Sequence, residues 1–541
     1  MLVAAAIVAG PFVIAAGALL AALAAGSRRV WLWALSLPSL AAGLLLWPSI
    51  HRDLSATGRA LHRAHAHGNP GRLVAAAWPH LWPVWVSAMT LAPLLALVLV
   101  YRRQTSLDDL QRAQREPSRA ANARLERRLA RHADGERERT GDASGVFLGY
   151  KLGGDELLPT SHRRVTLPLP RLAHHLLVTG ATGSGKTETV LRIAYSLAKT
   201  SDWTIVYLDG KGDPQTKDRF AGLMARAGRG VALFPDQAYD GWRGSPEEIA
   251  NRLLRLIDFA EEGGGTYYRD LAVSAIRLAC ATPSGPPRSA SELLRRLSPT
   301  GLSELHTGHP EAGHAASFRR EDLDAIRARY AAFFITVGNV LDGKLAFEQI
   351  DSAYFLLDGL RLKYEAGYLA RFLVEEFTQW AVGRKPREQR VLLIVDEFSA
   401  IATAGHGLVD VVERARGFGV AAALCPQVAE GMGGDEAAAR IIGSTKTILL
   451  HATAIPSQLV DVAGTRRVYE RAHQLDQQTL TGLGSTRLQH EYRVDLDEVR
   501  RLQVGQCFAI SPGQAMKLQI VPAPPFVREA AAGASSIRRS L

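Results

Sequence analysis

The pattern of apolar and polar positions divides this 541-residue chain into three kinds of segment. Near the N-terminus, three long and almost uncharged runs occupy residues 2–26, 30–47 and 81–101. A helix of about 20 apolar residues is long enough to cross the hydrocarbon core of a bilayer. These runs predict a transmembrane helical anchor over residues 1–103, with two or three helices.

The flanking charges indicate how such an anchor is oriented. No basic segment precedes the first run, which favours a retained anchor over a cleaved signal peptide. Arginines between residues 102 and 139 favour the cytoplasmic side, and three spans would then place the N-terminus outside. Four arginines within residues 51–72 conflict with this scheme, so a two-span topology stays open. The pattern predicts a multi-pass membrane protein whose remaining chain lies in the cytoplasm.

Short apolar runs of the second kind are typical of strands buried on both faces of a parallel sheet. Segments with helical periodicity separate most of them. This alternation predicts an α/β fold, a mostly parallel sheet flanked by helices, with its ligand site at the carboxyl ends of the strands. The expected strands cover residues 176–179, 203–208, 231–234, 354–357, 391–395, 420–424, 447–451, 507–511 and 517–521.

The third kind of segment is helical throughout, and it interrupts the alternation between residues 239 and 349. We interpret it as an all-α insertion domain within one α/β domain. A basic linker precedes that domain, and a tail rich in Ala, Gly, Ser and Arg, expected to be disordered, follows it. The predicted domains are 1–103 (transmembrane region), 104–145 (linker), 146–238 and 350–526 (the two parts of the α/β domain), 239–349 (insertion) and 527–541 (tail).

The first of the buried runs leads into a glycine-rich turn, GATGSGKT, at residues 180–187. The turn matches the phosphate-binding pattern G-x-x-x-x-G-K-[ST] in a strand–turn–helix context. Glycines let successive backbone N–H groups converge on phosphate, Lys186 adds a positive charge, and Thr187 offers a hydroxyl to Mg²⁺. The sequence predicts a nucleoside triphosphate site formed by Gly180, Ala181, Thr182, Gly183, Ser184, Gly185, Lys186, Thr187 and Glu188.

Two further strand ends carry polar residues that suit hydrolysis. The run at 391–395 ends in Asp396 and Glu397, an aspartate to hold Mg²⁺ and a glutamate to polarise water. Acidic residues at strand ends also cap helices, but the phosphate-binding turn favours the catalytic interpretation. The run at 420–424 leads to Gln427, whose amide is suited to sense the γ-phosphate.

Charge and cysteine content narrow the function further. The chain has 64 Lys and Arg against 53 Asp and Glu, a formal charge of +11. This balance suits nucleic acid or an anionic membrane face. The three cysteines are scattered at 280, 425 and 507, which predicts reduced, buried thiols and excludes a disulfide framework or a zinc site.

The order of the motifs resembles a known family. HHLLVTGATGSGKT at 174–187 is followed by DGKGD at 209–213, the helical insertion, LLIVDEF at 392–398, RARGFGV at 414–420 and CPQ at 425–427. This layout is similar to the type IV coupling proteins (TraG/TraD-like) of conjugation and type IV secretion, over residues 146–522. The three apparent spans and the absence of an acidic run in the tail depart from that family's pattern.

The resemblance implies a RecA-like ATPase that binds ATP and Mg²⁺ and forms a homo-hexameric ring at the inner membrane. It implies DNA bound without sequence preference, a relaxase or secreted substrate protein, and components of the secretion channel as partners. Carried over by motif, Lys186 and Thr187 bind phosphate and Mg²⁺, Asp396 holds the metal and Glu397 activates water. Arg416 would be the finger inserted into the neighbouring subunit's site, and Gln427 the γ-phosphate sensor.

Two other functions stay open at this point. FtsK/SpoIIIE-type double-stranded DNA translocases share the ATPase fold, but they lack a long helical insertion between the nucleotide motifs. A membrane-bound scaffold that binds nucleotide and docks substrate proteins is disfavoured by the intact Lys186, Asp396 and Glu397. An ABC transporter is disfavoured because no LSGGQ-like signature precedes the Asp-Glu strand.

Overall fold

A computed structural model describes residues 133–257, 265–358, 361–384, 390–397, 405–476 and 479–525, together with isolated residues between 48 and 127. The predicted spans at 2–26, 30–47 and 81–101 and the predicted tail at 527–541 lie outside the described residues.

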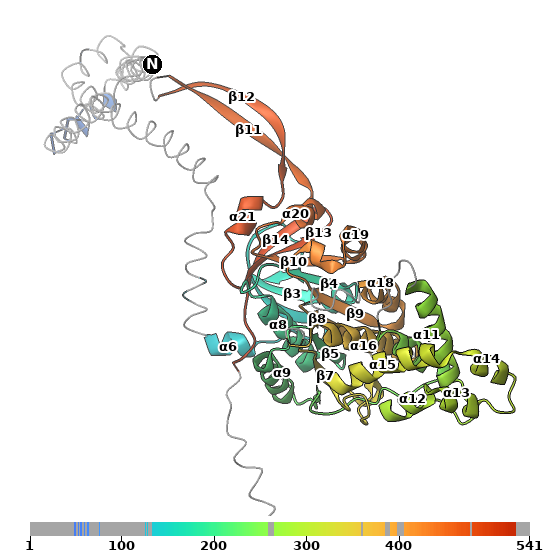
Figure 1. The fold of residues 1–541 in the computed structure, drawn as a ribbon. Helices are drawn as coiled ribbons and strands as arrows, with labels where there is room; N and C mark the ends of the chain where they lie inside the picture. Colours follow the sequence, from blue (N-terminus) through green and yellow to red (C-terminus); the bar gives the residue numbers. More distant parts are fainter. Residues whose placement is uncertain are drawn as a thin grey trace, which may run out of the picture. The chain divides into compact units, whose positions relative to one another are not determined.

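A twelve-stranded sheet is the centre of the fold (Figure 1). Seven strands are parallel, in the order β10-β4-β9-β8-β5-β7-β6, and five antiparallel strands extend the β10 side in the order β13-β14-β1-β3-β2. The predicted α/β fold with a mostly parallel sheet is therefore confirmed. The parallel strands are β4 (Leu176–Thr179), β5 (Thr204–Asp209), β6 (Ala232–Phe234), β7 (Ser352–Leu356), β8 (Val391–Asp396), β9 (Val420–Cys425) and β10 (Thr447–His451). The antiparallel strands are β1 (Gly145–Gly154), β2 (Thr160–Ser161), β3 (Arg164–Pro168), β13 (Gln506–Ser511) and β14 (Gln514–Ile520).

The central strands are apolar because both faces of the sheet are covered. Every position of β4, β8 and β9 is buried. Successive side chains of a strand point to opposite faces. In β5, Val206 and Leu208 accordingly join one cluster of buried side chains, while Ile205 and Tyr207 join another.

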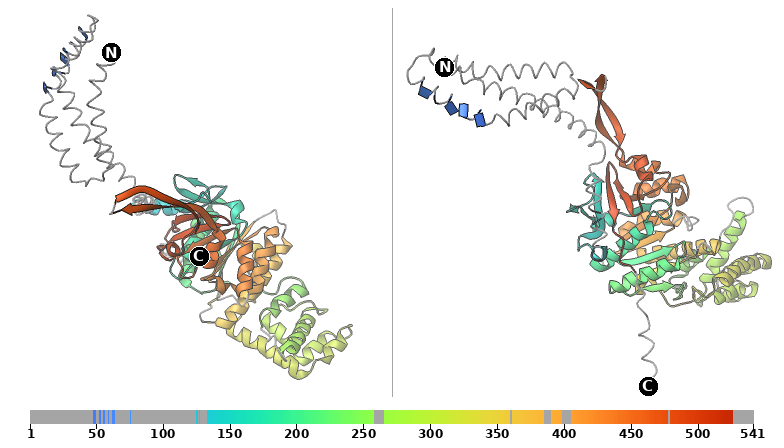
Figure 2. Two further views of the ribbon diagram at one scale, coloured as in Figure 1. Left: turned by 90° about the horizontal axis from the view of Figure 1, so that it is seen from above. Right: turned by 90° about the vertical axis from the view of Figure 1, so that its left-hand side faces the viewer.

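Helices cover both faces of this sheet (Figures 1 and 2). α8 (Lys186–Thr200) and α9 (Pro214–Arg226) contribute to the cluster that holds Tyr207, and α16 (Lys363–Gly383) contributes to the opposite cluster. The other described helices around the sheet are α6 (Ala133–Glu138), α7 (Leu169–Leu172), α18 (Gly405–Arg414), η4 (Ala415–Phe418), η5 (Ala429–Met432), α19 (Asp435–Ser444), α20 (Ser457–Ala463) and α21 (Leu496–Arg500).

Helices fill the chain between β6 and β7, coloured green to yellow in Figure 1. Within the described part of this stretch the only strand-like pairings are single bridges, Tyr239 with Leu345 and Asp240 with Asp342. Its buried side chains belong to the same apolar cluster as α16 and one sheet face, so the helices share a core with the sheet. They are α10 (Pro246–Leu254), α11 (Gly265–Cys280), α12 (Ala290–Arg296), α13 (Pro299–Leu305), α14 (Ala312–Ser317), α15 (Arg320–Val337) and η2 (Phe347–Gln349).

A separate two-stranded sheet joins β11 (Thr465–Asp476) to β12 (Thr479–Tyr492). The sequence pattern does not predict these strands. Their sequences carry polar residues at most positions and contain neither a continuous apolar run nor a clear alternation, which are the signals that predict strands.

The predicted localisation as a multi-pass inner-membrane protein is contradicted. Among the described residues, no helix combines the length and the apolar character that crossing a bilayer requires. The longest described helix, α16, has 21 residues but carries Lys363, Glu365, Arg371, Glu375 and Glu376. The apolar runs that motivated the prediction lie outside the described residues.

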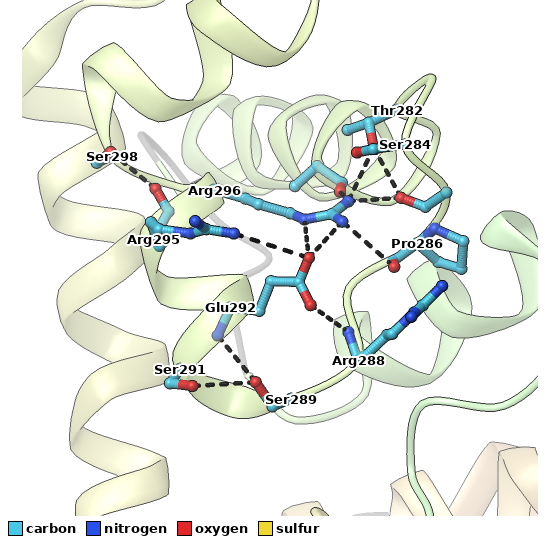
Figure 3. A network of polar contacts seen from close by, with 12 residues as sticks. Thr282, Ser284, Pro286, Arg288, Ser289, Ser291, Glu292, Arg295, Arg296 and Ser298 are labelled. Atoms are coloured by element: carbon cyan, nitrogen blue, oxygen red, sulfur yellow. Dashed lines mark hydrogen bonds and ion pairs between the residues drawn. The ribbon is translucent and has the colours of Figure 1, made fainter.

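A buried arginine joins two helices of the β6–β7 stretch (Figure 3). Arg296, on α12, is 3% exposed, and its guanidinium donates to carbonyls at the end of α11 and in the loop that follows. Its partners, at 2.6–3.3 Å, are the carbonyl oxygens of Ala279, Gly285 and Pro286, Oγ1 of Thr282 and Oε1 of Glu292. The side chain therefore fixes the end of α11 against α12.

Arg296→Ala should lower the free energy of unfolding by roughly 3 kcal/mol, because it removes the guanidinium that donates to the buried carbonyl of Ala279 and to Oε1 of Glu292. Arg295→Ala is the matched control. Arg295 lies 3.9 Å from the same Glu292 oxygen but is 75% exposed, so its loss should cost about 0.5 kcal/mol or less. Urea denaturation measures both, and equal losses would contradict the assignment.

Candidate nucleotide site

The glycine-rich turn connects β4 to α8 and needs its glycines for two reasons. Gly180, Gly183 and Gly185 have φ angles of 151°, 79° and 106°, in the region that favours glycine. At Gly180 there is also no room for a side chain, and at Gly185 a side chain would make a tight contact. A Cβ on Gly180 would lie 2.7 Å from Cβ of His451, and a Cβ on Gly185 would lie 3.0 Å from the backbone N of Gly505.

Lys186 is the first residue of α8, and its side chain folds back over the turn. Its Nζ donates to the carbonyl oxygens of Gly180 at 2.6 Å and Ala181 at 3.2 Å. Burial lowers the pKa of this ammonium, and the nearby carboxylates of Asp396 and Glu397 oppose the shift. The predicted phosphate-binding cation therefore lies within the loop.

Asp396 ends β8 beside the start of α8. Its Oδ2 accepts hydrogen bonds from Oγ1 of Thr187 at 3.0 Å and from the Tyr207 hydroxyl at 2.6 Å, and its Oδ1 accepts the backbone N–H of Glu397 at 3.0 Å. A hydroxyl and a carboxylate are the oxygen donors that Mg²⁺ prefers. In the described part of the chain, no group of three or more His, Cys, Asp or Glu side chains could hold a metal. A Mg²⁺ ion here would therefore need further ligands from phosphate and water.

The sheet order brings Gln427 to the same place. β9 lies between β4 and β8, so the residues after it emerge between the turn and the Asp-Glu pair. Nε2 of Gln427 donates to Oε1 of Glu397 at 2.7 Å. Glu397 has a φ of 56°, and non-glycine residues in this region cost energy and cluster at functional sites.

Glu188 points to a different part of the site. Its carboxylate forms a two-pronged ion pair with Arg219 of α9, with Oε2 2.6 Å from Nη2. Both residues line a cavity of about 480 Å³, together with Gln215 and Pro522. Of the other residues predicted for the loop, Ala181, Thr182 and Gly183 are exposed, and Ser184 is buried.

The structure does not bring Arg416 to this site. Arg416 lies in η4, before β9, and its Nη2 is 2.9 Å from Nε2 of His174, which precedes β4. Both residues lie at the amino ends of the parallel strands, whereas Gln427 lies at the carboxyl end of β9. At about 3.3 Å per residue, the six residues of β9 separate these two edges by about 20 Å.

His451 is a buried residue of the site that the sequence analysis missed. It ends β10, and its Nε2 is 3.0 Å from Oγ1 of Thr189 in α8. The next residue, Ala452, accepts the backbone N–H of Ala181 at 2.7 Å, so the end of β10 supports the turn. The only sequence signal was a polar residue ending a predicted strand, as at Asp396.

Comparisons with known proteins find one family profile and several similar solved structures. A family profile described as "Helicase HerA, central domain" matches residues 154–239. The chain is similar to the conjugative coupling proteins. The unbound TrwB coupling protein is 15% identical with a TM-score of 0.49, over 73% of this chain and 97% of that one. VirB4 of Thermoanaerobacter pseudethanolicus is 14% identical with a TM-score of 0.46, over 71% and 98%.

A TrwB structure in complex with ADP and Mg²⁺ is also similar, at 16% identity and a TM-score of 0.47, over 73% of this chain and 99% of that one. No curated protein matches the chain. All three identities are below 25%, and all three TM-scores are below 0.5.

The buried His451 predicts a pH-dependent stability. Burial lowers its pKa from the ordinary 6.5 to about 4, so the unfolded chain binds this proton first as the pH falls. The free energy of unfolding should therefore decrease from about pH 6.5 to about pH 4, with this residue contributing up to about 1.4 kcal/mol per pH unit. Urea denaturation between about pH 7 and pH 5 should give a smaller slope for His451→Gln. Identical slopes would contradict the prediction.

Proposed function

We propose that this chain is an ATP-driven DNA translocase of the coupling type. The observation that carries the proposal is the convergence of Lys186, Thr187, Asp396, Glu397 and Gln427 at the carboxyl ends of three neighbouring strands, β4, β9 and β8. Phosphate binding, metal binding, activation of water and sensing of the γ-phosphate require these side-chain types in one place.

Each of these residues has a distinct role. The backbone N–H groups of residues 180–188 and the Lys186 ammonium bind the phosphates of ATP. Thr187 and Asp396 hold Mg²⁺, which when bound neutralises charge on the phosphate oxygens. Glu397 accepts the proton of the attacking water. Gln427 senses the γ-phosphate, and its side chain, 2.7 Å from the Glu397 carboxylate, couples that group to the catalytic base.

DNA is the substrate that best fits the charge and the similarities. A formal charge of +11 favours the binding of a polyanion such as DNA. Lys and Arg contacts to the DNA backbone phosphates do not depend on the base sequence. A similar solved structure is a coupling protein of conjugation. Residues 154–239 match a family profile described as the central domain of a helicase. The finer proposal is that DNA, with an attached relaxase or secreted protein, is passed to components of a conjugative or type IV secretion channel.

We further propose that the chain acts as a homo-hexamer in which Arg416 works in trans. At the edge of the sheet opposite to its own phosphate-binding loop, Arg416 is remote from its own site but is exposed. In a closed ring with head-to-tail contacts, one edge of each subunit meets a different edge of its neighbour. The guanidinium would then stabilise transition-state charge in the neighbouring site.

Two substitutions test hydrolysis directly. Lys186→Ala should weaken nucleotide binding because it removes the phosphate-binding charge. Glu397→Gln should keep binding and lower turnover by about 10²- to 10⁴-fold, because it removes the group that accepts the proton. Binding of a fluorescent ATP analogue and steady-state phosphate release measure the two effects. Near-unchanged turnover in Glu397→Gln would remove this glutamate from the mechanism. If the unchanged chain itself hydrolyses ATP as slowly as a Glu397→Gln variant is expected to, a nucleotide-binding scaffold would be favoured.

Mixed oligomers test the trans role of Arg416. Arg416→Ala and Lys186→Ala subunits should each be inactive alone, since a finger is worth about 10³- to 10⁵-fold in rate. When mixed, some interfaces combine an intact loop with an intact Arg416, so activity should partly return. Arg414→Ala, two residues earlier and also exposed, is the control and should stay active. Full activity of Arg416→Ala alone, or no recovery in oligomers shown to be mixed, would contradict the assignment.

A further inference from the structure

Two aspartates end adjacent strands at the carboxyl edge of the parallel sheet, and the function proposed above uses only one of them. Asp209 of β5 and Asp396 of β8 are direct partners in the parallel register. Asp209 is 2% exposed, and its carboxylate accepts the backbone N–H groups of Lys211, Gly212 and Asp213 at 2.8–3.1 Å. These bonds fix the DGKGD loop, and they leave Asp209 saturated with donors.

A tyrosine hydroxyl reaches each of these aspartates from the neighbouring strand. Tyr354 on β7 donates to Oδ2 of Asp209 at 2.7 Å, and Tyr207 on β5 donates to Oδ2 of Asp396 at 2.6 Å. The two tyrosines are themselves partners in the register of β5 and β7. The same contact is thus repeated one strand further along the sheet, each time from a tyrosine to an aspartate nearer the carboxyl edge.

Packing fixes both hydroxyls independently of the hydrogen bonds. The rings of Tyr207 and Tyr354 are stacked with centroids 4.7 Å apart and planes 20° apart. Phe220 of α9 contacts both rings, with centroids 5.5 Å from each. All three side chains are fully buried, so the direction of each hydroxyl is set by the core of the protein.

The hydrogen bond from Tyr207 holds a proposed metal ligand, Asp396, whereas the hydrogen bond from Tyr354 holds Asp209, which has no proposed role in metal binding. Oδ2 of Asp396 has only two hydrogen-bond donors among the contacts described, the hydroxyls of Thr187 and Tyr207. Thr187 belongs to the loop and is itself a proposed metal ligand, so Tyr207 is the donor that the sheet supplies.

We propose that Tyr207 is a positioning residue for Mg²⁺: its hydroxyl holds the Asp396 carboxylate in the orientation in which Asp396 and Thr187 together receive the metal. This inference rests on the proposed nucleotide site. Partners that orient a metal ligand from behind are typically worth about 10- to 100-fold in metal affinity or activity. Tyr207 has no place in the phosphate-binding motif itself, so the motif alone does not identify it.

Tyr354 provides a matched control within the same packing. Tyr207→Phe and Tyr354→Phe each remove one buried hydroxyl, with nearly equal bond lengths, and both keep the stacked rings. Asp209 retains three backbone donors after the loss of Tyr354, whereas Asp396 retains only the Thr187 hydroxyl and the backbone N–H of Glu397 after the loss of Tyr207. A general cost of losing a buried hydroxyl should therefore affect both variants, and a metal-specific cost should affect Tyr207→Phe alone.

The test measures Mn²⁺ binding to the full chain in the presence of ADP, using electron paramagnetic resonance to count free Mn²⁺. Tyr207→Phe should raise the Kd for Mn²⁺ about tenfold or more, and Tyr354→Phe should leave it within about twofold. Thermal unfolding should show similar, small decreases in both variants. The rate of ATP hydrolysis by Tyr207→Phe should return towards that of the unchanged chain as Mg²⁺ is raised, which a purely structural defect would not allow.

An unchanged Kd for Mn²⁺ in Tyr207→Phe would overturn the inference. Equal weakening in both tyrosine variants would also overturn it, because the effect would then belong to the packing. Asp396→Asn, measured in the same series, reports on the underlying site. If Asp396→Asn binds Mn²⁺ as tightly as the unchanged chain, the proposed metal site fails; if it loses Mn²⁺ while Tyr207→Phe does not, only the role of Tyr207 fails.

Discussion

Parallel strands that are buried on both faces end at a common edge, and the position of every group in the nucleotide site depends on this constraint. β4, β9 and β8 are neighbours in the sheet, so the residues that follow them emerge side by side. The loop after β4 starts α8, the residues after β9 include Gln427, and β8 ends at Asp396. Thr187 contacts Asp396 across 209 residues of sequence, and Gln427 contacts Glu397 across 30 residues.

Burial at this edge makes each polar group dependent on a partner. A buried polar group without a hydrogen bond costs free energy, and a buried charge costs more. Lys186 accordingly bonds to loop carbonyls, Asp396 to two hydroxyls and Asp209 to three backbone N–H groups. The desolvated groups are thereby held in fixed directions before any ligand arrives, which is the preorganisation that electrostatic catalysis requires.

Local sequence patterns predicted the parts of the site that are local in the chain. The glycine-rich turn and the Asp396-Glu397 pair are short motifs at the ends of apolar runs, and the sheet order then explains why they meet. His451 and Tyr207 were missed because their importance comes from pairings with Thr189 and Asp396, far away in sequence. The β11–β12 pair was missed because polar strands lack an apolar pattern. The membrane prediction came from runs that the structure does not describe, and the described helices contradict it.

ATP turnover by the full chain, with and without DNA and over a range of salt concentrations, tests the central claim most directly. Contacts to DNA phosphates release counterions, so their contribution weakens steeply as salt rises. The account predicts that DNA of any sequence raises turnover at low salt, that the stimulation declines steeply with added salt, and that Lys186→Ala abolishes turnover in both conditions. Turnover that is the same with and without DNA at low salt would contradict an ATP-driven DNA translocase.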